Sequence, residues 1–213
     1  MSGPLAEYIL LHRHGAAQAS LAAQPAIALR LMVAHAMTGS ALWNVRAHEC
    51  ASRKEETRAS LEASKAAAEL EEKRARVSSL FEALGVRGEA RRNGDAYRLC
   101  EIFAAMLAMS DEEVMEVLAF TMAQTLEAGG PVVEAVLHVC ETDLPAYWKP
   151  DLAFFDLLRD KRAINAMVAE IGSRSLAESC AGDTAKVQKQ IIGNRITGNG
   201  CNPSPDWRPG WMQ

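Results

Sequence analysis

The sequence predicts an all-α protein. Ala, Leu, Met and Glu dominate its 213 residues, and β-branched runs bounded by turns are scarce. Apolar residues recur at three- and four-residue spacing in most segments, and the length suits one domain, alone or with an extension. We therefore expect a multi-helix, mostly antiparallel, bundle-like domain over residues 1–192, followed by an irregular tail rich in Gly, Asn, Pro and Trp over residues 193–213.

The first two helices are expected on either side of Gln24-Pro25. Leu5, Ile9 and His12 recur at helical spacing, which predicts a helix over about residues 4–22. Pro25 fits the first turn of a second helix, where its missing N–H costs nothing. Large apolar residues lie on nearly every side of that second helix, so we expect it to be buried.

Residues 53–84 predict a long charged helix. Thirteen of the 24 residues from 53 to 76 are charged, and Leu61 and Leu70 are the only large apolar ones among them. Such a helix is solvated along most of its length, and we expect it to project as an arm or to pack against its own copy. Gly85 then suits a left-handed helix stop.

Helix-start signals recur further along the chain. After a polar loop at 85–95, Asp95 is expected to cap a helix, and Ser110 with Glu113 predicts a capping box at the start of the next. The residues expected to point inward from the first of these helices are Leu99, Phe103 and Met106. Gly129-Gly130-Pro131 ends the capped helix and starts another.

Short helices are expected in the remaining sequence. An irregular segment lies between Pro145 and Pro150, and a helix begins near Asp151. The last helix, about 184–192, is expected to point Val187 and Ile191 inward. Beyond it we expect little regular structure.

Composition argues against several classes of protein. The chain has 27 acidic and 23 basic residues, so any contact with DNA must come from local patches. Its five cysteines include no CxxC pair, which argues against a zinc ribbon or a redox motif and favours reduced thiols. No signal peptide or membrane-length apolar run occurs. We expect a cytoplasmic protein that does not bind membranes.

The candidate catalytic and metal-binding residues have structural explanations. His12 and His14 are two residues apart and point to different sides of a helix, and His35 has no Cys or carboxylate at ligand spacing. The carboxylates of residues 111–116 mostly occupy a first helical turn, which negative charge stabilises. No nucleophile elbow or phosphate-binding glycine loop is present. We therefore expect no catalytic, cofactor-binding or metal-binding residues and no enzymatic activity, although an enzyme with an unrecognised site is kept as an alternative.

A family resemblance rests on two stretches. They are H-R-H at 12–14 with the Ala/Leu pattern, Gln24-Pro25 and His35 after it, and W-R-P-G-W-M at 207–212. Together these stretches resemble the region downstream of the DNA-binding core in ParB-like plasmid and chromosome partition proteins. The G-E-R-R nucleotide-binding motif of that family is missing here. The resemblance therefore implies that this chain is the C-terminal part of a longer protein, or the product of a gene that has lost its 5′ part.

The resemblance implies a non-catalytic accessory or assembly module for DNA partition and plasmid segregation. Its implied partners are a second copy of the chain, other proteins of the partition complex and DNA. The resemblance does not extend to the charged helix 53–84 and assigns it no role.

Direct DNA binding is the alternative function. Residues 172–195 combine short helices with Gly-containing turns, as in a helix-turn-helix unit. The residues suited to phosphate and base contacts are Thr184, Lys186, Lys189, Gln190 and Arg195. The competing interpretation is that these side chains form the solvated face opposite Val187 and Ile191.

Two tryptophans in the Pro-rich tail form the last candidate site. Leaving an indole ring in water is unfavourable. Trp207 and Trp211 are therefore expected either to fold back onto the helical body or to anchor a partner.

Overall fold

The computed structural model describes residues 3–38, 48, 50–86, 96–199 and 204–212, with the backbone alone at 33–38, 96, 99 and 211. Over these residues the chain is all-α, as the sequence predicts, and contains no strand. None of the described helices combines the length and apolarity that crossing a bilayer requires.

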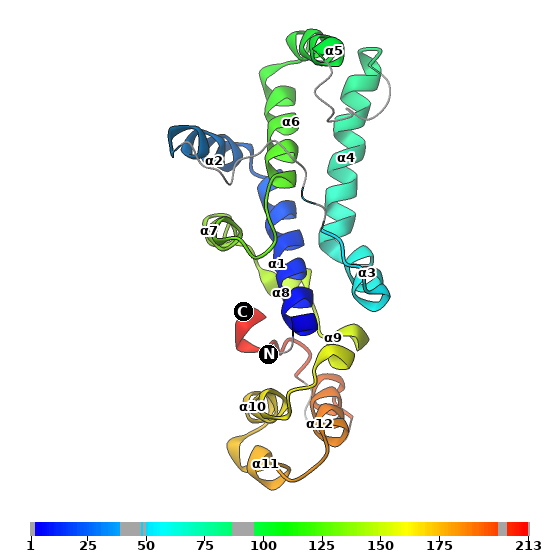
Figure 1. Ribbon diagram of the computed structural model, residues 1–213, viewed down its shortest axis with the longest axis vertical. Coiled ribbons are helices and arrows are strands. Elements are labelled where there is room, and N and C mark those ends of the chain that lie inside the picture. Colours follow the sequence, from blue (N-terminus) through cyan, green and yellow to red (C-terminus); the bar gives the residue numbers. More distant parts are fainter. Residues whose placement is uncertain (1–2, 39–47, 49, 87–95, 200–203, 213) are drawn as a thin grey trace. The chain divides into compact units, whose positions relative to one another are not determined.

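Figure 1 shows the order of the helices along the chain. In chain order they are α1 (Gly3–Ala22), α2 (Pro25–Thr38), α3 (Glu55–Glu62), α4 (Lys65–Ala83), α5 (Ala96–Leu107), α6 (Asp111–Gln124), α7 (Pro131–Val139), α8 (Leu144–Tyr147), α9 (Leu152–Leu157), α10 (Lys161–Ile171), α11 (Arg174–Ser179), α12 (Ala185–Thr197) and the 3-10 helix η1 (Gly210–Met212).

The chain forms two compact units. The first contains Met1–His12, Ser52–Ser60 and Asp143–Gln213, and the second contains Arg13–Ala51 and Leu61–Thr142. Helix α1 contributes residues to both units, ten to the first and ten to the second.

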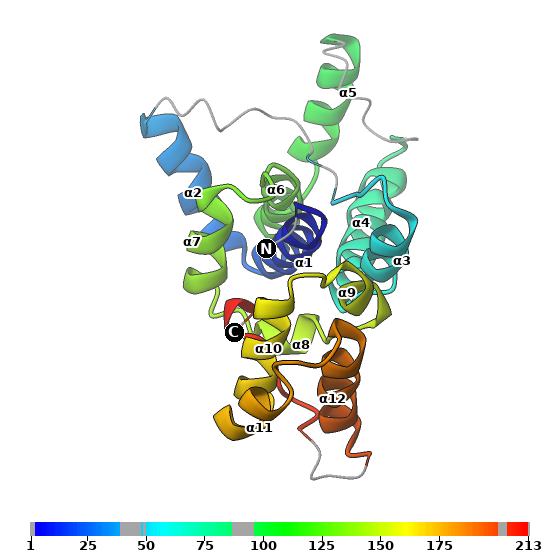
Figure 2. The same ribbon diagram turned by 60° about the horizontal axis from the view of Figure 1, so that its bottom comes forward.

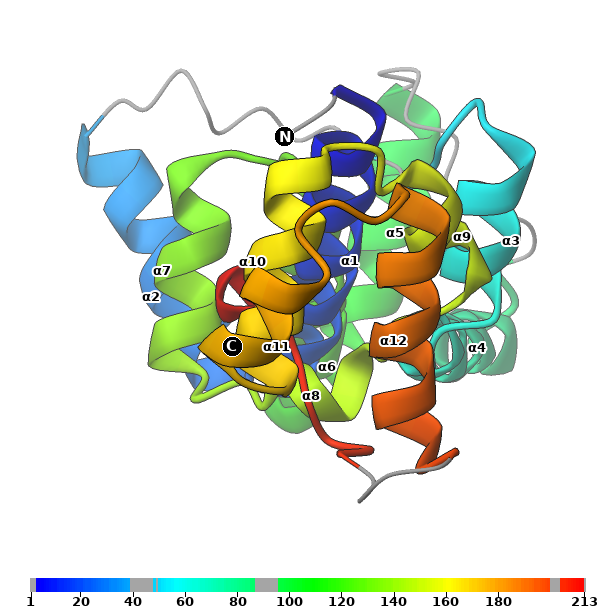
Figure 3. The ribbon, with the colours of Figure 1, turned by 90° about the horizontal axis from the view of Figure 1, so that it is seen from below.

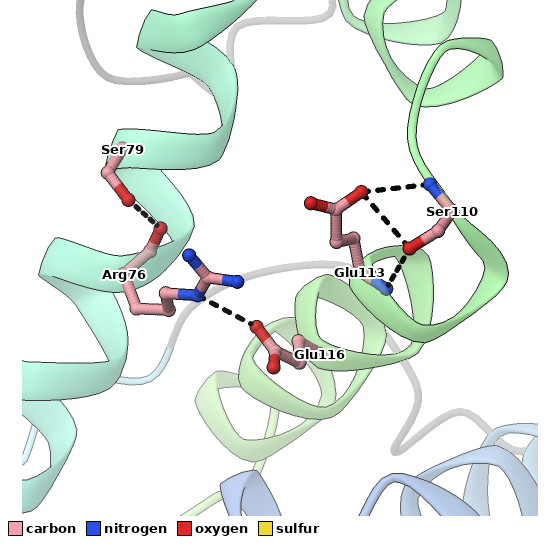
Figure 4. A network of polar contacts seen from close by, with 5 residues as sticks. All are labelled: Arg76, Ser79, Ser110, Glu113 and Glu116. Carbon is pink, nitrogen blue, oxygen red and sulfur yellow. Dashed lines mark hydrogen bonds and ion pairs between the residues drawn. The ribbon is translucent and has the colours of Figure 1, made fainter.

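The second unit is organised around α6, which packs against α2 and α4. Val117, Phe120 and Met122 of α6 are buried in this packing. The expected capping box is confirmed: the Ser110 hydroxyl accepts from the Glu113 N–H, and the Glu113 carboxylate accepts from the Ser110 N–H (Figure 4).

An ion pair joins two helices of the second unit. Arg76 Nε on α4 donates to Glu116 Oε2 on α6 over 3.2 Å (Figure 4). Both side chains are about half exposed, so solvent limits the pair to roughly 0–1 kcal/mol. Burial of the α6 apolar residues is therefore the main source of stability here.

The charged segment 53–84 differs from the expected single helix. It is divided into α3 and α4 at residues 63 and 64. Ser64 has extended backbone angles, and its hydroxyl accepts from the Ala67 N–H over 3.1 Å. A capping serine of this kind satisfies a free N–H at a helix start, so a new helix begins there. Gly85, at φ +81°, ends α4 as predicted.

The first unit contains a core of buried side chains from α1, from α9 to α12 and the turns next to them, from Trp148 and from Met212 of η1. Helix α10 packs against α11 and α12 (Figure 3). The turn between α10 and α11 is tight at Gly172, where a Cβ would lie 2.7 Å from Leu176 Cδ2 and 3.0 Å from the Val168 carbonyl oxygen. Only glycine fits there without displacement of its neighbours.

Helix α12 continues five residues past the end predicted for it. It ends at Thr197, before Gly198 with φ +75°, and not at Gly193. Ile192 is buried in the core and Ile196 packs against it, so tertiary burial favours another helical turn beyond Gly193. Residues 193–197 therefore belong to the helical body rather than to an irregular tail.

The described end of the tail is attached to the first unit. Arg208 is buried, and its guanidinium Nε donates to the Trp148 carbonyl oxygen over 2.8 Å. Further bonds run to the carbonyl oxygens of Pro145, Pro205 and Trp207. A guanidinium presents five donors in a fixed plane, which allows one side chain to hold several backbone segments together.

Candidate functional site

The predicted helix-turn-helix-like segment contains α11, a turn over residues 180–184 and α12. Buried Gln188 donates to the Cys180 carbonyl oxygen over 2.7 Å and so ties α12 to this turn. On α10, Asn165 Nδ2 donates to the Ala177 carbonyl oxygen at the end of α11 over 2.8 Å. Both bonds cross between elements, and neither is visible in the sequence pattern.

The inward face of α12 agrees with the predicted one at Ile191, which packs against the core, and differs from it at Val187. Gln188 and Ile192, one turn apart, are buried, whereas Val187 is 42% exposed. The apolar pattern alone placed Val187 inside. The carbonyl of Cys180 provides a hydrogen-bond acceptor that a glutamine reaches and a valine does not use. At this turn of α12 the buried position is therefore residue 188 rather than residue 187, and Val187 lies on the outward face.

The five residues suggested for DNA contact have different surroundings. Lys186 and Gln190 are exposed and stand one turn apart on α12. Thr184 is the N-cap of α12, its hydroxyl accepting from the Val187 N–H. Arg195 lies half-buried in the last turn of the helix. Lys186 and Gln190 remain the outward pair.

Lys189 is engaged within the protein. Its ammonium group donates to the Phe155 carbonyl oxygen on α9, and the side chain is half-buried. Desolvation lowers the pKa of Lys189, while nearby Asp156 opposes this effect. A lysine held in this way must break its internal bond before it can contact a phosphate.

A second cluster, made of polar residues, lies inside the first unit. Tyr8 and His12 are one turn apart on α1, with ring centroids 4.5 Å apart. Ser60 follows from α3, and Trp148 and Asp151 stand before α9. We call Tyr8, His12, Ser60, Trp148 and Asp151 the Asp151 cluster.

The hydrogen bonds of the Asp151 cluster converge on one carboxylate. Asp151 Oδ1 accepts from the Tyr8 hydroxyl and from the Phe154 N–H, each over 2.8 Å, and Oδ2 accepts from the Ser60 hydroxyl. Trp148 Nε1 donates to the Tyr8 oxygen over 2.9 Å. Asp151 thereby caps α9 and joins it to α1 and α3.

This direction of donation assigns the tautomer of His12. Because the Ser60 proton points to Asp151, the 3.1 Å contact between Ser60 Oγ and His12 Nε2 requires an N–H on that nitrogen. Burial lowers the pKa of His12 to about 4, although the Asp151 carboxylate opposes the effect. Burial also raises the pKa of the Tyr8 hydroxyl.

The Asp151 cluster contains the residue types of a Ser-His-Asp triad in a different order. In a triad the histidine accepts the serine proton and the aspartate orients the histidine. Here the serine stands between the other two residues, and its proton is bonded to the carboxylate. The described geometry therefore joins three helices and leaves the serine without histidine activation.

The two N-terminal histidines have separate surroundings. His14 belongs to the second unit, where its Nε2 bonds the Leu126 carbonyl oxygen over 2.6 Å, and desolvation lowers its pKa. His12 belongs to the first unit. Across the described part of the chain, no group of three His, Cys, Asp or Glu side chains is placed to hold a metal ion.

The two tail tryptophans are described unequally. Trp207 is half-buried and packs against the core of the first unit. The backbone of Trp211 forms part of η1, and its side chain lies outside the described residues.

Comparisons with models of protein families, with curated proteins and with solved structures found no match to this chain.

Proposed function

We propose that this chain is a non-catalytic accessory module of a ParB-like DNA-partition system that works in the cytoplasm by binding. The family part of the proposal rests on the resemblance of residues 12–37 and 207–212. The observation that carries the non-catalytic part is the direction of hydrogen bonding in the Asp151 cluster. There a serine, a histidine and a carboxylate serve to cap α9 and to join helices.

Retention of the replicon that encodes the chain tests this role. Deleting the gene is expected to increase loss of the replicon per generation. Ser60→Ala, expressed at the parental level, is expected to restore retention, because the proposed role needs no nucleophile. Unchanged loss after the deletion would contradict a partition role. Failure of a folded Ser60→Ala protein to restore retention would contradict the non-catalytic mechanism.

Direct DNA binding remains a second candidate because of one observation. Lys186 and Gln190 stand exposed on the same side of α12, after a turn held by Gln188. A side chain in that position suits a phosphate contact. Each such contact changes the slope of log affinity against log salt by about 0.9 for duplex DNA.

Fluorescence anisotropy with a labelled duplex over a salt series tests this second candidate. Lys186→Ala is expected to weaken binding and to reduce the slope by about 0.9. Lys149→Ala is the matched control, because Lys149 is exposed in the same unit but lies outside the α11–α12 segment. Equal effects of the two substitutions would contradict a specific role for α12.

A further inference from the structure

A buried guanidinium fastens the C-terminal tail to the first unit. Arg208 is 3% exposed, and its Nε and Nη2 donate to the Trp148 and Pro145 carbonyl oxygens over 2.8 and 3.2 Å. Its Nη1 donates to the carbonyl oxygens of Pro205 and Trp207 within the tail. In Figures 1 and 2 the end of the tail, η1, lies beside α8 and α10. We call the Pro145 and Trp148 carbonyl oxygens the carbonyl cradle, which the tail fills with its arginine.

The carbonyl cradle exists because α8 is short. Pro150 disfavours helical backbone at residue 149 and has no N–H to donate, and α8 ends at Tyr147 after a single turn. Trp148 then has extended backbone angles, φ −142° and ψ 140°. In a longer helix the N–H of residue 149 would bond the Pro145 carbonyl, so the early end leaves this oxygen to a donor from outside the helix. The two carbonyls therefore meet one planar donor.

The carbonyl cradle is also held from the inside of the first unit. The Trp148 indole N–H donates to the Tyr8 oxygen over 2.9 Å, and the indole packs edge-on against Phe154 with ring centroids 5.3 Å apart. The Trp148 backbone N–H donates to the Leu144 carbonyl oxygen over 3.0 Å. Groups that are fixed before a ligand arrives lose little freedom when it binds. We therefore expect the cradle to keep its shape when the tail leaves it.

The surroundings of the carbonyl cradle define the ligand that fits it. A guanidinium fork reaches two carbonyls at once, whereas an ammonium group is a compact and strongly hydrated charge. The charge of Asp143 favours a cation at this place. Contacts along the tail select apolar neighbours: Trp207 packs against the core, Pro209 is buried and Met212 lies inside the core. The matching ligand is an arginine that follows an aromatic residue and precedes apolar ones.

The tail is suited to leave this site. Removing a guanidinium from water is costly, and the partial charges of carbonyl oxygens offset this cost less than a carboxylate does. Burial accordingly lowers the pKa of Arg208, against the charges of Asp206 and Asp143. Chain ends that are held by a few side chains belong to the least stable parts of a fold and open before the rest unfolds. Once the tail opens, the cradle is accessible to another arginine.

We propose that the carbonyl cradle of Pro145 and Trp148 is a binding site for an arginine-bearing segment of a partner protein, and that Arg208 occupies it as an internal competitor. The partner segment binds by displacing the tail, so the tail sets the concentration of partner that is needed. This site goes beyond the partition role and depends on no part of it. Its test measures binding to the purified protein, so its failure is distinguishable from failure of that role.

Fluorescence anisotropy of a labelled peptide with the sequence of residues 204–212 tests the site on the full chain. Arg208→Glu replaces a donor with an acceptor that the carbonyls repel, which releases the chain's own tail. In the parent the tethered tail competes at an effective concentration on the order of millimolar, so Arg208→Glu is expected to bind the peptide at least about tenfold more tightly. Lys149→Glu, an exposed residue beside the cradle, makes the same change of charge and is the matched control, expected to bind as weakly as the parent.

A second peptide and an unsubstituted protein complete the test. The peptide with Arg208→Lys is expected to lose binding to the Arg208→Glu protein, because an ammonium group does not present the planar fork. In the parent, an excess of the arginine peptide is expected to speed hydrogen exchange of the tail amides, and the lysine peptide is not. This measurement needs no substitution, so it decides the question even if Arg208→Glu does not fold.

Three results would overturn the proposal. They are equal affinity of a folded Arg208→Glu protein and the parent for the peptide, equal affinity of the two peptides, and tail exchange in the parent that the arginine peptide leaves unchanged. Sedimentation velocity identifies one further occupant. A parental mass that rises with concentration, and does not with Arg208→Glu, would assign the cradle to the tail of another copy and overturn the assignment to a partner protein.

Discussion

The buried histidine of the Asp151 cluster makes the first unit sensitive to acid. His12 is 6% exposed, and burial lowers its pKa from 6.5 to about 4. Between these two values the unfolded chain binds a proton at residue 12 and the native protein does not. By linkage, stability is present above pH 6.5 and is lost as the pH falls towards 4. Asp151, which faces the imidazole, opposes the shift but does not reverse it.

The size of the effect follows from the two pKa values. Lowering the pH from 7.5 to 5.0 is expected to cost the parent roughly 2 kcal/mol through His12 alone, at about 1.4 kcal/mol per pH unit below 6.5. His12→Gln keeps an N–H donor for Ser60 and removes the titration. The variant is therefore expected to lose roughly 2 kcal/mol less than the parent over this pH range.

Urea unfolding at the two pH values, followed by tryptophan fluorescence, measures the difference. Trp148 is buried, and its ring centroid lies 6.3 Å from that of His12, so its emission reports on this cluster. His14 is present in both proteins, so its own contribution cancels. His138→Gln, at an exposed histidine, is the matched control and should keep the parental acid sensitivity. Equal losses for the parent and His12→Gln would refute the reasoning.

Three further substitutions test the packing and the helix ends, each by urea unfolding unless stated. Gly172→Ala is expected to destabilise by about 1–3 kcal/mol, because the new Cβ would lie 2.7 Å from a leucine methyl carbon; Gly182→Ala, in open space, is its control. Ser110→Ala removes the capping box at a cost of about 1 kcal/mol, against Ser79→Ala, whose hydroxyl donates to the Arg76 carbonyl oxygen within its own helix. Arg208→Met should increase cleavage of the tail in limited proteolysis, because the tail loses its bonds to the body.

Each of these expectations has a contrary outcome. Stability of the Gly172 variant equal to that of the Gly182 variant would mean that the α10–α11 turn opens at little cost. No difference between the two serine variants would mean that the capping box adds nothing in this context. A tail cleaved at the parental rate after loss of the guanidinium would show that other contacts hold it.

Most local features of the fold could be predicted from neighbouring residues. The start of α2 at Pro25, the capping box at Ser110 and the left-handed stop at Gly85 all lie where the pattern places them. Each depends on a conformational preference or a hydrogen bond within about five residues. The division of the charged segment at Ser64 has the same local origin, but the long run of charged residues concealed it.

The Asp151 cluster was missed because its members come from three distant parts of the chain. No spacing rule connects residues 12, 60 and 151, and Ser60 gave no signal of its own beside the charged residues around it. The signal that was available is the i,i+4 pair of Tyr8 and His12, two polar rings on an otherwise apolar helix face. Such a pair predicts a buried partner without identifying it.

The sequence by itself determined the all-α class and most helix boundaries, because helix propensity, caps and glycine stops act over one or two turns. Only the tertiary structure decided which side of each helix is covered. Phe103 lies exposed because, among the residues that the structure describes, none covers that side of α5, and Gln188 replaces Val187 on the inside of α12 because the Cys180 carbonyl needs a donor there. Apolar periodicity records which residues favour burial, whereas the neighbouring elements determine where burial and hydrogen-bond partners are available.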